Sequence, residues 1–173
     1  MFSVRKFKNI NITFLKHIAR LLQFWVAILY RIKVMESELN YSQSYISQIL
    51  REVETIALIG ASADPKKDSY KVMKFLLDQN YEVFPVNPNE KGTKILGRYC
   101  YGDLQSIKVK IDMVEIFRKP EAVLGIAKEA VEIGSKVLWT QLGIVDEEAS
   151  KVAKKNGLKV VMNRCPKIEL LNK

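Results

Sequence analysis

The residues best suited to chemistry in this 173-residue chain are a turn of small residues and the bases around it. Gly60-Ala61-Ser62 follows a short apolar run, and small side chains there let the backbone approach a phosphate group closely. The segment is not a G-x-G-x-x-G motif, because Ser stands at the second glycine position and Pro65 at the third. Exposed bases are usually only solvated, but five of them together would suit a ligand with several phosphates: Lys66, Lys67, Lys71, Arg118 and Lys119.

Composition excludes several kinds of catalytic and metal site. The single histidine, His17, lies near the N-terminus, so a histidine triad or histidine base is excluded in the rest of the chain. Cys100 and Cys165 are far apart, and no C-x-x-C spacing indicates a zinc site. We therefore name no catalytic residue and no metal ligand. Two cysteines do not form a disulfide framework, which favours the reducing cytoplasm as the location.

The net charge of +9 is unevenly distributed along the chain. Residues 1–34 hold seven Lys or Arg and no acid, which leaves the remaining residues with a net charge of only +2. A protein that binds nucleic acid should carry its positive charge on the folded body. The distribution therefore argues against nucleic acid as a partner, and we treat residues 1–34 as a basic N-terminal extension and residues 35–173 as the domain.

The extension has two interpretations. Its longest apolar stretch, Leu21 to Tyr30, has ten residues, whereas a membrane-spanning helix needs about 20. A helix lying on a membrane surface is one interpretation, with bases flanking aromatic side chains. The other is that Met35 is the true start of translation, because composition changes there. On composition we favour the start-site artefact or a disposable extension, and expect membrane contact only if residues 1–34 are real.

Strand and helix patterns alternate through the domain. Continuous apolar runs predict strands buried on both faces at residues 55–59, 82–86, 112–117, 136–140 and 159–162. Helices are expected at residues 37–52, 69–80, 120–133 and 146–156, with Ser37, Ser69 and Asp146 as caps of the first, second and fourth. The alternation predicts an α/β fold: a Rossmann-like doubly wound, mainly parallel sheet of five or six strands with helices on both faces. A short strand near residues 98–101 would add an edge.

In such a sheet, ligands bind beyond the carboxyl ends of the strands, near the point where the strand order reverses. The segments that follow the strands should therefore line one edge. Arg118 ends a buried strand, where a guanidinium suits a phosphate. The second strand ends at Asn87, where a NAD-binding fold commonly has Asp or Glu, and this counts against NAD(H). We expect Trp139 in the core and Glu115 paired with Arg118 or Lys119.

The ordered set of these segments resembles a family of small, stand-alone CoA-binding proteins, related to the CoA-binding domain of the succinyl-CoA synthetase α subunit. The resemblance runs from about Glu54 to Leu170 and does not cover residues 1–34. Gly102 stands where the family often has Pro, and Glu115 where it often has Asp. The motifs that carry it are residues 59–62, 69–73, 86–88, 113–118, 138–143 and 162–169.

The resemblance implies a binding site for coenzyme A. The pyrophosphate would lie at the Gly60–Ser62 turn and the Ser69 helix start, which makes this a phosphate-binding loop. Asn87 and Pro88 would border the adenosine, Phe117 and Arg118 the nucleotide end, and Gln141 to Gly143 the pantetheine path. The full expected set is Gly60, Ala61, Ser62, Lys66, Ser69, Tyr70, Asn87, Pro88, Phe117, Arg118, Lys119, Gln141, Leu142 and Gly143.

The resemblance implies binding rather than ligase activity, because the catalytic histidine of the synthetase belongs to another domain. We expect a non-catalytic protein that binds CoA or acyl-CoA. The alternatives are a nucleotide-cofactor oxidoreductase, an acyl-CoA enzyme that requires a partner subunit, or a vestigial domain with protein partners only. A homo-oligomer is left open. Cys165 should lie at the ligand edge, either as an inert, partly buried thiol or as one that forms a mixed disulfide with CoA.

Overall fold

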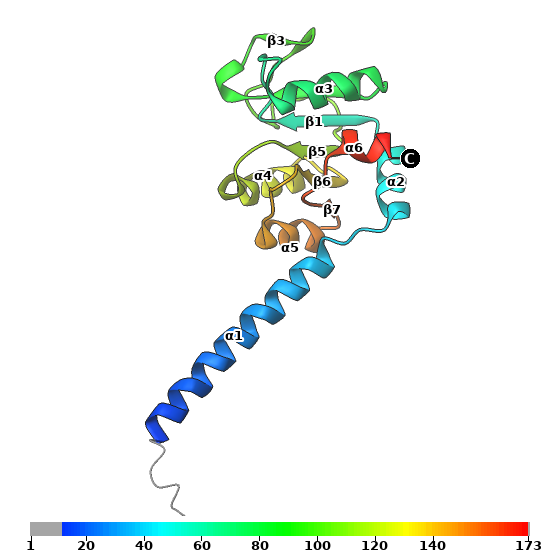
Figure 1. Ribbon diagram of the computed structural model, residues 1–173. Helices are drawn as coiled ribbons and strands as arrows, with labels where there is room; N and C mark the ends of the chain where they lie inside the picture. The colour runs from blue at the N-terminus through cyan, green and yellow to red at the C-terminus, as the bar shows by residue number, and fades with distance from the viewer. Residues whose placement is uncertain (1–11, 173) are drawn as a thin grey trace, which may run out of the picture. The chain divides into compact units, whose positions relative to one another are not determined.

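The computed structural model describes residues 12–172, and the chain divides into two compact units, residues 1–40 and 41–173. Helix α1 (Ile12–Glu38) belongs to the first unit and continues through Met35 (Figure 1). Ser37 therefore lies inside α1, and the expectation that it caps a helix over residues 37–52 is wrong. The next helix, α2 (Gln43–Glu52), begins after Ser42, whose hydroxyl accepts a hydrogen bond from the Tyr45 N–H at 3.2 Å.

The second unit is built on a five-stranded parallel sheet, which confirms the predicted fold class. Its strands are β1 (Thr55–Ile59), β2 (Glu82–Val86), β5 (Met113–Ile116), β6 (Val137–Thr140) and β7 (Lys159–Val161), in the order β2-β1-β5-β6-β7. The sequence-based strand ranges differ from these by one residue at most at each end. The chain leaves β1 towards β2 and later returns to the other side of β1, so the strand order reverses between β1 and β5.

The short strand expected near residues 98–101 does not extend the sheet in the way predicted. β4 (Arg98–Tyr99) pairs with β3 (Lys94–Ile95) in a separate antiparallel ribbon. That ribbon follows a short 3-10 helix, η1 (Pro88–Glu90). A single parallel bridge between Val86 and Tyr101 joins the end of this segment to β2.

Helices cover both faces of the sheet. The remaining helices are α3 (Asp68–Asp78), α4 (Pro120–Glu132), α5 (Glu147–Lys155) and α6 (Pro166–Leu171), and α6 was not expected from the sequence. α4 packs against α5, whereas α6 packs against α2 and α3. Right-handed crossovers that move in opposite directions from β1 and β5 place α3 and the α4–α5 pair on opposite faces. Asp146 caps α5 as predicted, with the Ala149 N–H donating to its carboxylate at 2.9 Å.

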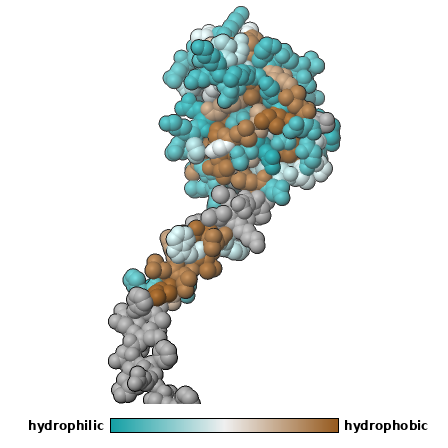
Figure 2. All heavy atoms as spheres, in the orientation of Figure 1, coloured by the Kyte–Doolittle hydropathy of each residue, from teal (hydrophilic) through white to brown (hydrophobic). Residues whose placement is uncertain are grey.

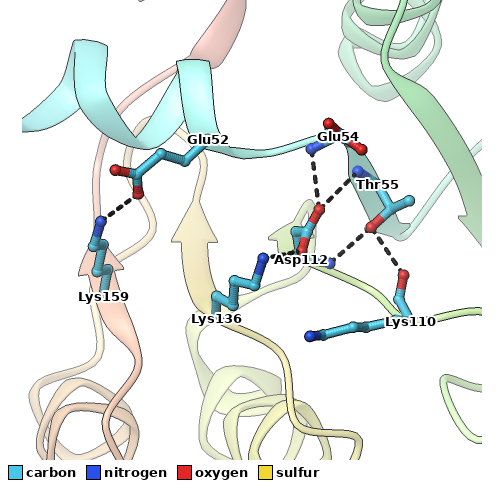
Figure 3. Close-up of polar contacts among 7 residues, drawn as sticks. All are labelled: Glu52, Glu54, Thr55, Lys110, Asp112, Lys136 and Lys159. Atoms are coloured by element: carbon cyan, nitrogen blue, oxygen red, sulfur yellow. Dashed lines mark hydrogen bonds and ion pairs between the residues drawn. The ribbon is translucent and has the colours of Figure 1, made fainter.

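The amino ends of the strands are joined by the carboxylate of Asp112 (Figure 3). Its Oδ2 accepts hydrogen bonds from the N–H groups of Glu54 (3.1 Å) and Thr55 (3.3 Å), and its Oδ1 lies 2.7 Å from Nζ of Lys136. Burial raises the pKa of Asp112, but the Lys136 ammonium and the two N–H groups outweigh it and hold the pKa below its ordinary value. This one side chain therefore ties the starts of β1, β5 and β6 together.

Replacing Asp112 by Ala should lower the free energy of unfolding by about 2 kcal/mol, because two backbone N–H groups at the start of β1 lose their acceptor. Urea unfolding at pH 7 measures this. Lys159→Ala is the matched control, because it removes only the exposed pair with Glu52 (2.7 Å; Figure 3) and should cost clearly less. Equal losses in the two variants would contradict the role of Asp112.

Candidate functional site

The carboxyl ends of β1 and β5 approach each other closely at the point where the strand order reverses. Gly60, directly after β1, has φ of +84°, and a Cβ there would lie 2.5 Å from the carbonyl oxygen of Phe117. It would also lie 3.0 Å from Cδ of Arg118. Only glycine fits both the backbone conformation and the space. The sequence predicted a tight turn at this position, but the contact with Phe117 follows from the sheet order.

Arg118 lines three pockets at this edge. One of them, of about 540 Å³, is formed by residues 117–122 alone, and the other two are each formed by several elements. The first of these two, which we call the α6 pocket, has a volume of about 630 Å³ and lies between α3, the segments after β5 and β6, and α6. The second, which we call the α4 pocket, has a volume of about 390 Å³ and lies between the turn after β1, residues 102–104 and α4. Both volumes are in the range of small-molecule and cofactor sites, about 300–1,000 Å³.

The structure brings seven of the expected ligand residues to these pockets. The α6 pocket is lined by Phe117, Arg118, Lys119, Gln141 and Leu142. The α4 pocket is lined by Gly60, Pro88 and Arg118. Sequence reasoning missed the contributions of α4 and α6, because a helix that follows a strand does not reveal which pocket its side chains will line. Cys165 does lie at this edge and lines the α6 pocket, with 7% of its surface exposed.

The other expected residues lie outside the walls of both pockets: Ala61, Ser62, Lys66, Ser69, Tyr70, Asn87 and Gly143. Ser69 is not the helix cap, because α3 begins at Asp68 and its cap position is Lys67. Ser69 instead lies buried in the first turn of α3. The side chain of Asn87 supports the turn after β1, since its Nδ2 donates to the carbonyl oxygen of Ala61 at 2.7 Å.

The turn after β1 already uses several of its own N–H groups. Those of Gly60 and Ala61 donate to the carbonyl oxygen of Val86, at 2.9 and 3.4 Å. The N–H of Ala63 donates to the carboxylate of Glu90 at 3.1 Å. The N–H groups of the first turn of α3 have no acceptor within their own helix, as in any helix. They point outward from the N-terminal end of α3. The donors available to an anion thus lie at the beginning of α3 more than in the turn itself.

The bases at this edge differ in how they are paired. Lys71 forms an ion pair with Asp68 at 3.1 Å, one turn earlier in α3. Arg118 and Lys119 take part in none of the ion pairs among residues 12–172, and both side chains are exposed. A guanidinium and an ammonium without a protein partner, side by side at the reversal point, are suited to binding a negatively charged group.

Glu115 does not pair with Arg118 or Lys119, contrary to expectation. It is fully buried in β5, in register with Leu58 of β1 and Trp139 of β6, on a face of apolar side chains. Its Oε1 accepts a hydrogen bond from Nε2 of Gln141 at 2.7 Å, and its Oε2 has no partner. Burial raises the pKa of the Glu115 carboxyl to about 8, and the bond from Gln141 only partly opposes this. A buried, protonated carboxyl group therefore holds a side chain that lines the α6 pocket.

The raised pKa of Glu115 predicts how stability depends on pH. Between its ordinary pKa of 4.5 and about 8, the folded state keeps a proton that the unfolded state loses. The free energy of unfolding should therefore fall as the pH rises through this window, by roughly 3–5 kcal/mol in total.

Glu115→Gln should largely abolish this loss, so that the variant gains on the wild type between pH 5 and pH 8.5. Urea unfolding at both pH values measures the gain. Glu82→Gln, at an exposed position in β2, is the matched control and should follow the wild type. Parallel pH profiles for wild type and Glu115→Gln would show that Glu115 titrates normally.

A doubly wound parallel sheet of this strand order, with helices on both faces, defines a Rossmann-like α/β domain. The family of the CoA binding domain matches residues 54–170, and the chain belongs to this family. This confirms the resemblance that the motifs indicated.

Relatives of the chain fall into two groups. The uncharacterized protein YneT of Bacillus subtilis is 37% identical over 75% of this chain and 94% of its own length. A solved structure of a hypothetical protein from Pyrococcus horikoshii is 40% identical, with a TM-score of 0.73 over 77% of this chain and 92% of the other. The second group contains larger proteins. The α subunit of an ADP-forming acetate–CoA ligase from Pyrococcus furiosus is 31% identical over 62% of this chain, but over only 26% of the subunit.

Proposed function

We propose that the unit from Tyr41 onward binds CoA or an acyl-CoA and performs no chemistry of its own. The observation that carries the proposal is Arg118, an arginine without an ion pair that follows β5 at the reversal point and lines both the α6 pocket and the α4 pocket. CoA carries a pyrophosphate and a further phosphate, which need more than one base. Lys119 lies next in the chain, and Lys71 and Lys167 line the same α6 pocket.

We further propose how the parts of CoA are distributed over the edge. The pyrophosphate would lie between the Gly60–Ser62 turn and the first turn of α3, where N–H groups and Arg118 can reach it. The adenosine would lie beside Pro88, in the α4 pocket. The pantetheine would follow residues 141–143 into the α6 pocket, whose apolar side chains Val72, Phe117 and Ile168 suit an alkyl chain.

Two features argue against the alternative functions. An oxidoreductase that uses NAD would need an acid at the end of β2, but Asn87 stands there and its amide is engaged with Ala61. A complete ligase would need further domains, since the match covers only about a quarter of the acetate–CoA ligase subunit.

The cytoplasm is the expected compartment, because Cys100 and Cys165 are both free thiols.

A panel of ligands tests the proposed function directly. CoA should raise the melting temperature of the full chain by several degrees, because saturation at 100 times Kd stabilises the folded state by about 2.7 kcal/mol. NAD, NADP and ATP at the same concentration should give clearly smaller shifts in scanning fluorimetry. Equal shifts for all four ligands, or none, would overturn the proposal.

Arg118→Ala should weaken CoA binding by about 10- to 100-fold, because a charge-assisted contact to phosphate is worth about 1.5–3 kcal/mol. Isothermal titration measures the Kd. Arg51→Ala makes the same change at an exposed position near the end of α2 and should leave the Kd unchanged. An Arg118→Ala variant that binds CoA like Arg51→Ala would exclude Arg118 as a phosphate ligand.

A further inference from the structure

Helix α1 exposes many large apolar side chains. Seven of them between Ile18 and Leu29 are at least 38% exposed. Figure 2 shows brown, hydrophobic spheres gathered along the described part of the helix. The seven residues are Ile18, Leu21, Leu22, Phe24, Trp25, Val26 and Leu29. Scattered single apolar residues are normal on a surface, but a continuous set of this size marks a binding surface.

Apart from His17, the polar and apolar side chains of residues 16–29 lie on opposite faces of α1, and His17 falls between Phe24 and Leu21 at one border of the apolar side. With about 3.6 residues per turn, Lys16, Arg20, Gln23 and Ala27 fall on one narrow face. Ile18, Leu21, Leu22, Trp25 and Leu29 fall on the opposite face, with Phe24 and Val26 at its borders. We call this second set, together with its two border residues, the apolar face of α1.

The apolar face does not belong to a membrane-spanning helix. Among residues 12–172 the structure contains no helix that is long and apolar enough to cross a bilayer. Lys16 and Arg20 lie on the polar face, so the helix suits a boundary between apolar and aqueous surroundings. Trp25 and Tyr30 are the residue types that prefer the level of lipid headgroups.

The charge of the N-terminal segment indicates what kind of surface covers the apolar face of α1. The sequence has seven Lys or Arg and no acid before Glu36, so this segment would be attracted to an anionic surface. A second copy of α1 would bring four bases from each helix together, and the two acids at the end of α1, Glu36 and Glu38, offset these charges only in part. The apolar face is also wider than the seam of a two-stranded coiled coil, which uses only two positions in every seven residues.

We propose that α1 lies in the headgroup region of an anionic lipid bilayer, with its apolar face towards the acyl chains, and holds the CoA-binding unit at the membrane. Composition alone favoured a start-site artefact for residues 1–34. Composition, however, carries no information on how polar and apolar side chains are arranged around the helix. The inference is independent of the proposed CoA binding, because it uses no residue of the second unit.

Sedimentation with vesicles tests the inference on the full chain. Vesicles of phosphatidylcholine with 30% phosphatidylglycerol should bind the protein at least tenfold more tightly than phosphatidylcholine alone, and 0.5 M salt should weaken this binding. The emission of Trp25 should shift to shorter wavelength on binding, while the fully buried Trp139 contributes a constant background.

A pair of matched variants separates apolar burial from charge. Trp25→Glu and Ala27→Glu each add one negative charge, but on opposite faces of α1. Trp25→Glu should bind anionic vesicles at least tenfold more weakly than Ala27→Glu. Both variants should keep the CoA-induced shift in melting temperature if CoA binds, so failure of one proposal is distinguishable from failure of the other.

Three results would overturn the inference. The first is no preference for anionic vesicles, and the second is equal binding by the two variants. The third is an intact mass of the native protein that corresponds to a chain starting at Met35. Light scattering identifies the competing occupant: a dimer that is lost in Trp25→Glu, without vesicle binding, would assign the apolar face to a second copy of the chain.

Discussion

The contact between Gly60 and the backbone of Phe117 is the constraint on which the ligand edge depends. Because no Cβ separates them, the ends of β1 and β5 approach closely at the reversal point, and Arg118 lies directly over the turn. One guanidinium without an ion pair therefore lines both the α6 pocket and the α4 pocket, which contain helices from opposite faces of the sheet. A larger residue at position 60 would need both a different φ and a displaced strand end.

The two edges of the sheet serve different purposes. At the amino edge, the carboxylate of Asp112 is fully engaged with backbone N–H groups and Lys136, which stabilises the starts of three strands. Towards the carboxyl edge, Glu115 is buried with an unpartnered oxygen, which costs stability and leaves Gln141 oriented. The carboxylate of Asp112 is thus satisfied by its partners, whereas one oxygen of the Glu115 carboxyl group is not.

Local sequence patterns predicted most of the elements. The apolar runs located the five strands, and the charges and cap of α5 located that helix, because these signals lie within a few residues of each other. The caps at Ser37 and Ser69 were wrong because serine at a plausible spacing does not by itself start a helix. The partner of Glu115 was missed because Gln141 lies 26 residues away, on a neighbouring strand.

The sequence alone determined the alternation of strands and helices, the uneven charge, with seven bases and no acid in residues 1–34, and the family to which the motifs point. Only the tertiary structure decided that β5 pairs with β1, and hence that Phe117 and Arg118 meet Gly60 while Gln141 meets Glu115. It also decided that α6 forms one wall of the larger pocket. The physical reason is that strand order and pocket walls depend on contacts between segments far apart in the chain, which no local periodicity encodes.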